Sequence, residues 1–264
     1  MLRMPLALLT LLLMMLRPVA ANELYFLGQP IPDIKKPWAS ADYRQLLEAL
    51  RTVQTNHTDA LPRRGGEFTG PLYQRMINPD NYRSQLNIHI PLEQRQEEAR
   101  HTLSHLRELM RLYLDFNAAQ QPYAGEALGL MSYSLRQQAV LFTLTVEFWM
   151  TLSGEERRNP VRVRGLQDTK AAAAQLTRSA FDFLPMIQQF GAAELEQYAA
   201  ELAVQLPELF VHLPSPARSE LIERVNTLAR EHAVTGVRER LTGLQPILAA
   251  VQADMQTKTV ARAD

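Results

Sequence analysis

Apolar side chains recur at helical spacing along most of the chain after Pro91. Repeats at intervals of three and four residues are typical of helices that bury one face. Together with an earlier segment from about Ser40 to Asn56, the pattern predicts long helices over Pro91–Ala119, Gly125–Leu152, Leu166–Gln189, Ala192–Leu213, a segment that opens at Ser215 and Pro216, and Gly236–Met255. The predicted fold class is therefore all-α, a single-domain helical bundle or array of about six long helices.

The main bundle is expected over residues 91–255, as one domain together with residues 38–90. Residues 22–90 form a loop-rich N-terminal quarter with an extended, proline-punctuated start. Gly70 with Pro71, and Asn78 with Pro79, are expected to open two short helices. Alternating apolar residues favour a short strand at Leu86–Ile90. A small β-ribbon is predicted in which its partners are Leu24–Leu27 or Val161–Arg164.

The N-terminus has the pattern of a cleavable export signal. A basic start is followed by the apolar run Met4–Leu16 and by small residues at Val19 and Ala21, which favours a signal peptide over residues 1–21, cut after Ala21. The run is shorter than the roughly 20 residues of a spanning helix, so we expect no membrane span after cleavage. The expected location is the periplasm of a bacterium, with release from the cell as the open alternative. Residues 256–264 are expected to form a flexible tail.

Composition narrows the range of functions. The chain has no cysteine, which excludes disulfides, thiol catalysis and thiolate metal sites. Without Arg3 and Arg17 of the signal, 26 basic and 28 acidic side chains remain. Nucleic-acid binding depends largely on an excess of positive charge, so this balance argues against nucleic acid as a partner.

The stretch Glu97–Glu108 carries the strongest candidate for chemistry. Glu97, His101, His105 and Glu108 fall on one stripe of the expected helix, where two imidazoles and a carboxylate are able to hold zinc or a similar divalent metal. The spacing resembles that of zinc-protease helices, although Thr102 stands where their general-base glutamate would follow the first histidine. The alternatives are a solvated or salt-bridged face and a contact with a partner or ligand.

A second candidate is a polar loop before the main bundle. Arginines, glycines and amide side chains gather there, and such loops often carry binding residues. We assign to this predicted binding loop Arg63, Arg64, Arg75, Asn78, Tyr82 and Arg83. In the later apolar helix, the lone acid Glu147 is expected to pair with a group from another helix.

No complete catalytic constellation is present in the sequence. The favoured function is an exported, all-helical protein that binds another protein or a cell-envelope ligand, without a cofactor. One alternative is a metal-dependent enzyme that uses the pair His101 and His105. Another is a periplasmic inhibitor or immunity-type protein.

Overall fold

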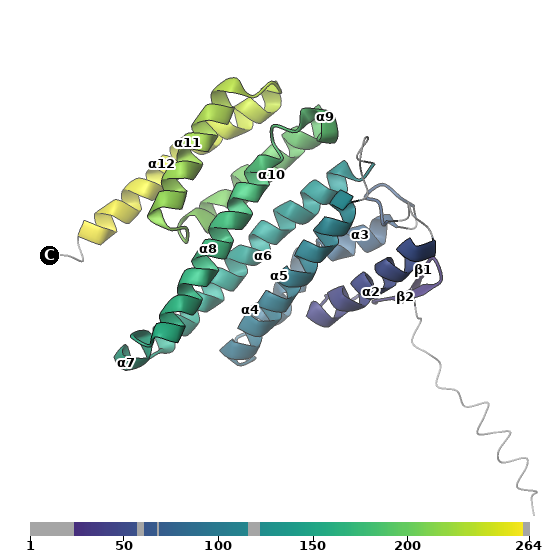
Figure 1. The fold of residues 1–264 in the computed structure, drawn as a ribbon, viewed down its shortest axis with the longest axis horizontal. Coiled ribbons are helices and arrows are strands. Elements are labelled where there is room, and N and C mark those ends of the chain that lie inside the picture. The colour runs from purple at the N-terminus through teal and green to yellow at the C-terminus, as the bar shows by residue number, and fades with distance from the viewer. Residues whose placement is uncertain (1–23, 57–60, 68, 116–121, 261–264) are drawn as a thin grey trace, which may run out of the picture.

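The computed structural model describes residues 24–56, 61–67, 69–115 and 122–260. The fold is all-α, as predicted, with one short β-hairpin near the N-terminus (Figure 1). The predicted signal peptide, residues 1–21, lies outside the described residues. In chain order the long helices are α2 (Ser40–Asn56), α5 (Leu92–Asp115), α6 (Ala124–Thr151), α8 (Pro160–Asp182), α10 (Ala192–Phe210), α11 (Ser215–Glu231) and α12 (Thr235–Val260).

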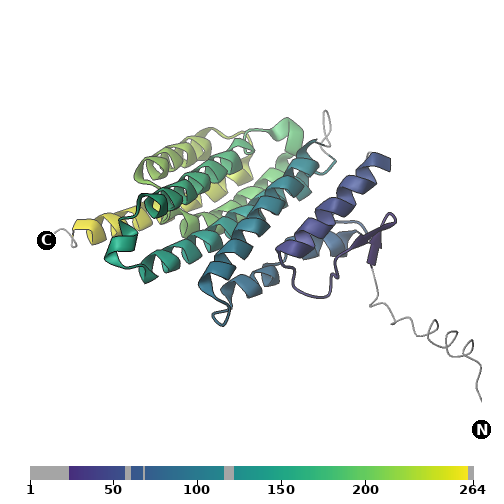
Figure 2. The same cartoon turned by 60° about the horizontal axis from the view of Figure 1, so that its bottom comes forward.

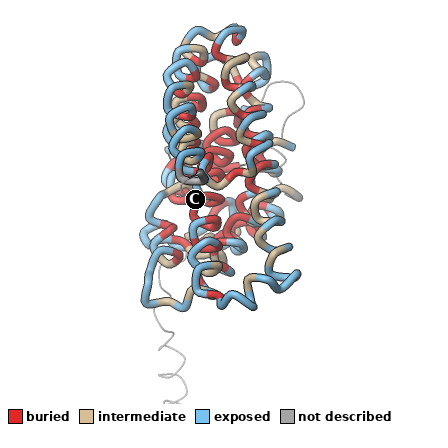
Figure 3. Tube along the Cα trace, turned by 90° about the vertical axis from the view of Figure 1, so that its left-hand side faces the viewer, coloured by how far each residue is buried: buried red, intermediate tan, exposed pale blue. Residues whose placement is uncertain are grey.

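The long helices form an array in which each helix packs on one or more helices that are close to it in the chain. Helix α2 packs on α5, α5 on α6, α6 on α10, α10 on α12, and α12 on α11, while α8 packs on α6 (Figures 1 and 2). Buried positions gather in the middle of this array and exposed positions lie on its outside (Figure 3). Among the described residues, no helix combines the length and apolarity needed to cross a membrane.

Helix α6 is the central element. Its residues are buried on nearly every side from Ala124 to Thr145, as its almost unbroken apolar sequence predicts. Glu147 lies beyond this buried part and pairs with Arg95 of α5, with 2.9 Å between Oε1 and Nη2. The expectation that Glu147 pairs with a group from another helix is thus confirmed.

The short elements lie between α2 and α5. They are α3 (Gly70–Met76), the 3-10 turn η1 (Pro79–Tyr82) and α4 (Arg83–Leu86). Pro71 occupies the first turn of α3. The Asn78 side chain caps η1 by accepting the Asp80 N–H at 2.8 Å, so both predicted helix starts are confirmed.

The predicted strand at Leu86–Ile90 is wrong, whereas a small β-ribbon that contains the predicted segment at Leu24 is present. Leu86 ends α4, and Asn87 turns the chain by accepting the His89 N–H. The alternation has no sheet face to bury, because Ile88 is 79% exposed. The hairpin is instead formed by β1 (Leu24–Phe26) and β2 (Gln29–Ile31), joined through Gly28 at a φ of 82°.

Two helix boundaries also differ from the prediction. Val161–Arg164 is not a strand, since α8 begins at Pro160 and is capped by the Asn159 side chain. Helix α12 continues to Val260, through the first part of the predicted tail at residues 256–264. The remaining elements are the short helices α7 (Gly154–Arg157) and α9 (Ile187–Phe190).

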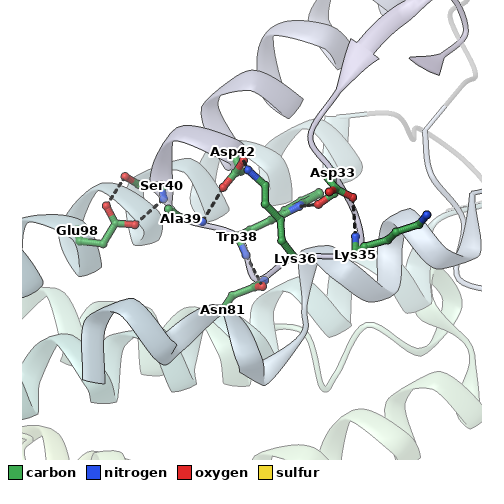
Figure 4. Close-up of polar contacts among 9 residues, drawn as sticks. All are labelled: Asp33, Lys35, Lys36, Trp38, Ala39, Ser40, Asp42, Asn81 and Glu98. Carbon is green, nitrogen blue, oxygen red and sulfur yellow. Dashed lines mark hydrogen bonds and ion pairs between the residues drawn. The ribbon is translucent and has the colours of Figure 1, made fainter. Parts of the chain in front are cut away.

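The segment before α2 is fastened to the core by polar contacts (Figure 4). Trp38 is 1% exposed, and its backbone N–H donates to Asn81 Oδ1 at 2.9 Å. Ser40, at the start of α2, donates from its backbone N–H and its hydroxyl to the Glu98 carboxylate of α5. A side chain of α5 therefore serves as the cap of α2.

Asn81 links four groups inside this region. Its Oδ1 accepts from Trp38 and from the Arg75 guanidinium, and its Nδ2 donates to the Tyr43 hydroxyl and the Arg75 carbonyl, each at 2.8 to 2.9 Å. Asn81 is 1% exposed, so water cannot replace these partners without rearrangement.

We expect Asn81→Ala to lower the free energy of unfolding by about 2 to 4 kcal/mol, because it leaves several buried polar groups unpaired. Asn226→Ala is the matched control. Asn226 is half-buried and accepts one side-chain bond, from Gln245, so we expect a loss below about 1 kcal/mol. Urea unfolding of both variants provides the measurement, and equal losses would contradict the role of Asn81 as a hub.

Candidate functional site

The histidine stripe of α5 lies beside α2. His101 is exposed, and its Nε2 is 3.5 Å from Glu97 Oε1, while Glu108 is ion-paired with Arg51 of α2. His105 is half-buried between them, and its Nδ1 is buried without a hydrogen-bond partner among the described residues. Two of the four predicted ligands thus form their own pair, and a third is held by a cation.

The described residues contain no group of three or more histidine, aspartate or glutamate side chains placed to hold a metal ion. The binding of zinc or a similar metal by His101 and His105 stays a prediction. Its ligand set would need Glu108 to leave Arg51 and a further side chain to approach.

The six residues of the predicted binding loop divide between three places. Arg75 and Tyr82 belong to the interior, where Tyr82 stacks on Tyr133 with ring centroids 5.1 Å apart, and the half-buried Asn78 borders them. Arg83 is exposed and pairs with Asp80. Arg63 and Arg64 alone line a cleft.

The interior part is a network of tyrosine hydroxyls. The Tyr43 hydroxyl donates to the Met76 carbonyl at 2.6 Å, and the Tyr133 hydroxyl donates to the Asn78 carbonyl at 3.1 Å. Burial raises the pKa of Tyr43 well above its usual value, so this phenol stays protonated and acts as a donor. The network holds α3 and η1 against α2 and α6.

Arg63 and Arg64 stand on a loop that is fixed at several points. The Arg64 N–H donates to Glu126 Oε1 at 2.6 Å, and the Arg63 N–H donates to the Thr69 hydroxyl at 3.0 Å. Gly66 lets the loop close, since a Cβ there would lie 2.1 Å from Thr69 Oγ1. The loop is therefore a formed wall of the cleft.

We call this cavity the loop cleft. It has a volume of about 750 Å³ and lies between the loop, the start of α6 and the turn from α9 into α10. Its lining consists of Arg63, Arg64, Gly65, Gly66, Pro122, Ala124, Gly125, Glu126, Gln189, Phe190, Gly191, Ala193, Glu194 and Gln197.

The charged side chains of the loop cleft fall into two groups. Arg64 and Glu126 are engaged. The Arg64 guanidinium donates to Gln197 Oε1 at 2.9 Å and faces Glu201 at 3.8 Å, and the buried Glu126 accepts the Arg64 N–H. Arg63 instead lies over the Tyr123 ring at 4.9 Å and forms no ion pair within the described residues. Glu194, at the start of α10, likewise has no ion pair in that part of the chain. The cleft thus offers one cation and one anion from different walls.

Three comparisons with known proteins, against family models, curated proteins and solved structures, gave no match.

The pKa of His105 is lowered, chiefly because burial disfavours the charged imidazolium. Near these pKa values the unfolded chain therefore binds more protons than the folded one. The contribution of His105 to stability is complete above the pKa of the unfolded state, about 6.5, and is lost as the pH falls below that value. We expect His105→Gln to reduce the loss of stability between about pH 7 and pH 5. Burial also lowers the pKa of His212, so part of the loss of stability remains in this variant.

Urea midpoints at the two pH values measure this effect. His89→Gln replaces an exposed histidine and is the control, which we expect to keep the wild-type loss. If His105→Gln lost as much stability between the two pH values as the wild type does, His105 would not be a source of the pH dependence.

The metal prediction is tested by elemental analysis of the protein purified without chelator or histidine tag. If His101 and His105 hold a metal, a near-stoichiometric transition metal will be found and will be lost in the His101→Ala, His105→Ala double variant. A metal content unchanged by the double variant would remove these residues from the site.

Proposed function

We propose that this protein is an exported binding protein that holds a small dipolar ligand of the cell envelope in the loop cleft. The observation that carries the proposal is the cleft itself. It has the size of a small-molecule site, and its wall is the segment of the predicted binding loop that contains Arg63 and Arg64.

The chemistry of the lining indicates the ligand class. Arg63 offers a guanidinium from the loop, and Glu194 offers a carboxylate from α10. The amide of Gln189 adds a further donor and acceptor. A ligand that carries both a negative and a positive group, such as a short peptide, matches this set.

The cleft is supported from beneath by buried contacts. The Tyr113 hydroxyl donates to the Pro62 carbonyl at 2.7 Å, and the Leu61 N–H donates to the Tyr123 hydroxyl at 3.0 Å. A preformed wall reduces the ordering cost of binding, which favours a ligand site over a loop that adapts to each partner. Export through the signal peptide predicted from the sequence would bring the protein to the envelope, where such molecules occur.

The metal-dependent enzyme and the inhibitor or immunity-type protein stay predictions. The contacts of Glu97 and Glu108 described above favour neither of them over a binding protein.

The proposal is tested by native mass spectrometry of the purified protein after incubation with a low-molecular-weight extract of the cell envelope. We expect a bound mass that is lost in Ala193→Trp, because Ala193 is exposed and lines the cleft, so an indole there fills it. Ala233→Trp places the same indole on an exposed position after α11 and should retain the bound mass. Arg63→Gln should weaken binding by roughly tenfold through loss of a charged hydrogen bond.

Two results would contradict this function. A bound mass that persists in Ala193→Trp would place the ligand outside the loop cleft. The absence of any bound mass from the envelope extract would remove the support for a small-molecule ligand.

A further inference from the structure

A second binding surface lies on another face of the array, where α5 and α8 flank α6 (Figures 1 and 2). Two clefts open there, with volumes of about 540 and 470 Å³, and each is lined by residues of all three helices. We call them together the arginine trough. Its charged and polar members include Arg100, Arg107, Arg111, Asp115, Arg162 and Thr169.

The floor of the trough is one stripe of α6. Met131 lines the first cleft, and Thr145 and Leu152 line the second. Gln138 stands seven residues from both Met131 and Thr145, so it lies on the same stripe between the clefts. Positions seven apart on a helix point in nearly the same direction. The floors of the two clefts therefore lie on one stripe of α6, and the buried Gln138 stands between them.

Gln138 has an unused hydrogen-bond donor. The side chain is 0% exposed, and its Oε1 accepts from Arg107 at 3.4 Å. Its Nε2 is buried and has no partner in the described part of the chain. A buried amide without a partner costs free energy, and Gln138 lines neither cleft, so it contributes to the covered part of the stripe.

The charge of the trough is strongly one-sided. Four arginines line it, with Asp115 at one end as the single acid of the two linings. Arg100, Arg107 and Arg111 follow one edge of α5, and none of them forms an ion pair among the described residues. Partial burial lowers the pKa of Arg107, as expected for a guanidinium that lacks a carboxylate partner.

The trough ends in two apolar pockets. Met110, Leu114, Met131 and Leu176 form one, and Phe148, Trp149, Leu152, Val161 and Leu166 form the other. Met131 and Trp149 are 18 residues apart on α6, which corresponds to roughly 27 Å. Polar side chains line the clefts beside these apolar residues, with Arg107 and Arg111 in the first and Gln96, Arg100 and Thr145 in the second. An acyl chain of that length would lie against these polar groups, whereas an amphipathic peptide can match them.

We propose that the arginine trough binds an acidic amphipathic helix of a partner protein. Apolar side chains near both ends of that helix enter the two pockets, and its carboxylates face the arginines of α5. A helix of about 18 residues spans the distance between the pockets. This inference is independent of the loop cleft, with which the trough shares no lining residue.

The test is fluorescence anisotropy with the whole mature chain. The probe is a fluorescein-labelled synthetic helical peptide of about 18 residues that carries a leucine stripe flanked by glutamates. A second peptide has lysine in place of every glutamate. We expect saturable binding of the acidic peptide, weakened by added salt, and at least about tenfold weaker binding of the lysine peptide.

The variant Arg100→Gln, Arg107→Gln, Arg111→Gln should bind the acidic peptide roughly tenfold more weakly and with a smaller salt dependence. The matched control is Arg158→Gln, Arg164→Gln, Arg240→Gln, which removes the same charge from exposed positions outside both clefts. We expect the control to stay within about twofold of wild type. Trp149→Ala, which empties one pocket, should also weaken binding, and circular dichroism checks that each variant is folded.

Four outcomes would overturn the proposal. They are no binding of the acidic peptide, equal binding of the two peptides, equal effects of the trough and control variants, and binding to phosphatidylglycerol vesicles without binding to the peptide. The last would identify the trough as a contact for an anionic membrane surface. None of these results bears on the Ala193→Trp test of the loop cleft.

Discussion

The burial of α6 is the constraint on which the rest of the structure depends. A helix of this apolarity must be covered along most of its length, and α5, α8 and α10 provide the cover. Some of its buried polar side chains are matched from those neighbours, as when Gln205 of α10 donates to the Ser132 hydroxyl at 2.7 Å. Both proposed binding surfaces lie beside α6, one at its start and the other where α5 and α8 flank it.

The loop cleft and the trough suit different kinds of binding. The loop cleft has balanced charge and a wall held by backbone hydrogen bonds, which favours a small ligand in a fixed orientation. The trough is long, positively charged and closed at each end by an apolar pocket, which favours an extended partner. A protein with both surfaces is able to hold a ligand and a partner at the same time.

The sequence predicts the helices well because periodic burial is a local signal. The boundaries of α2 and α6 lie within a residue of those expected. The prediction of a strand at Leu86–Ile90 fails because alternation alone does not show whether a neighbouring strand and a packed sheet face exist. The start of α8 was missed although Asn159 followed by Pro160 is a regular helix-start signal. The sequence predicts Arg63 and Arg64 as loop residues. It does not predict that Arg100, Trp149 and Arg162 line one cleft, because that depends on how three helices pack.

The packing of each helix on helices that are close in the chain has a consequence for how the protein folds. Most helices pack on the next long helix or on one close by in sequence, so many native contacts close short loops. Such a topology favours rapid folding that proceeds from one end as the chain emerges. The exception is the segment around Trp38, whose backbone bonds to Asn81 and whose following helix is capped by Glu98. That segment completes its contacts only after α5 has formed. A segment that is synthesised early therefore reaches its native contacts late.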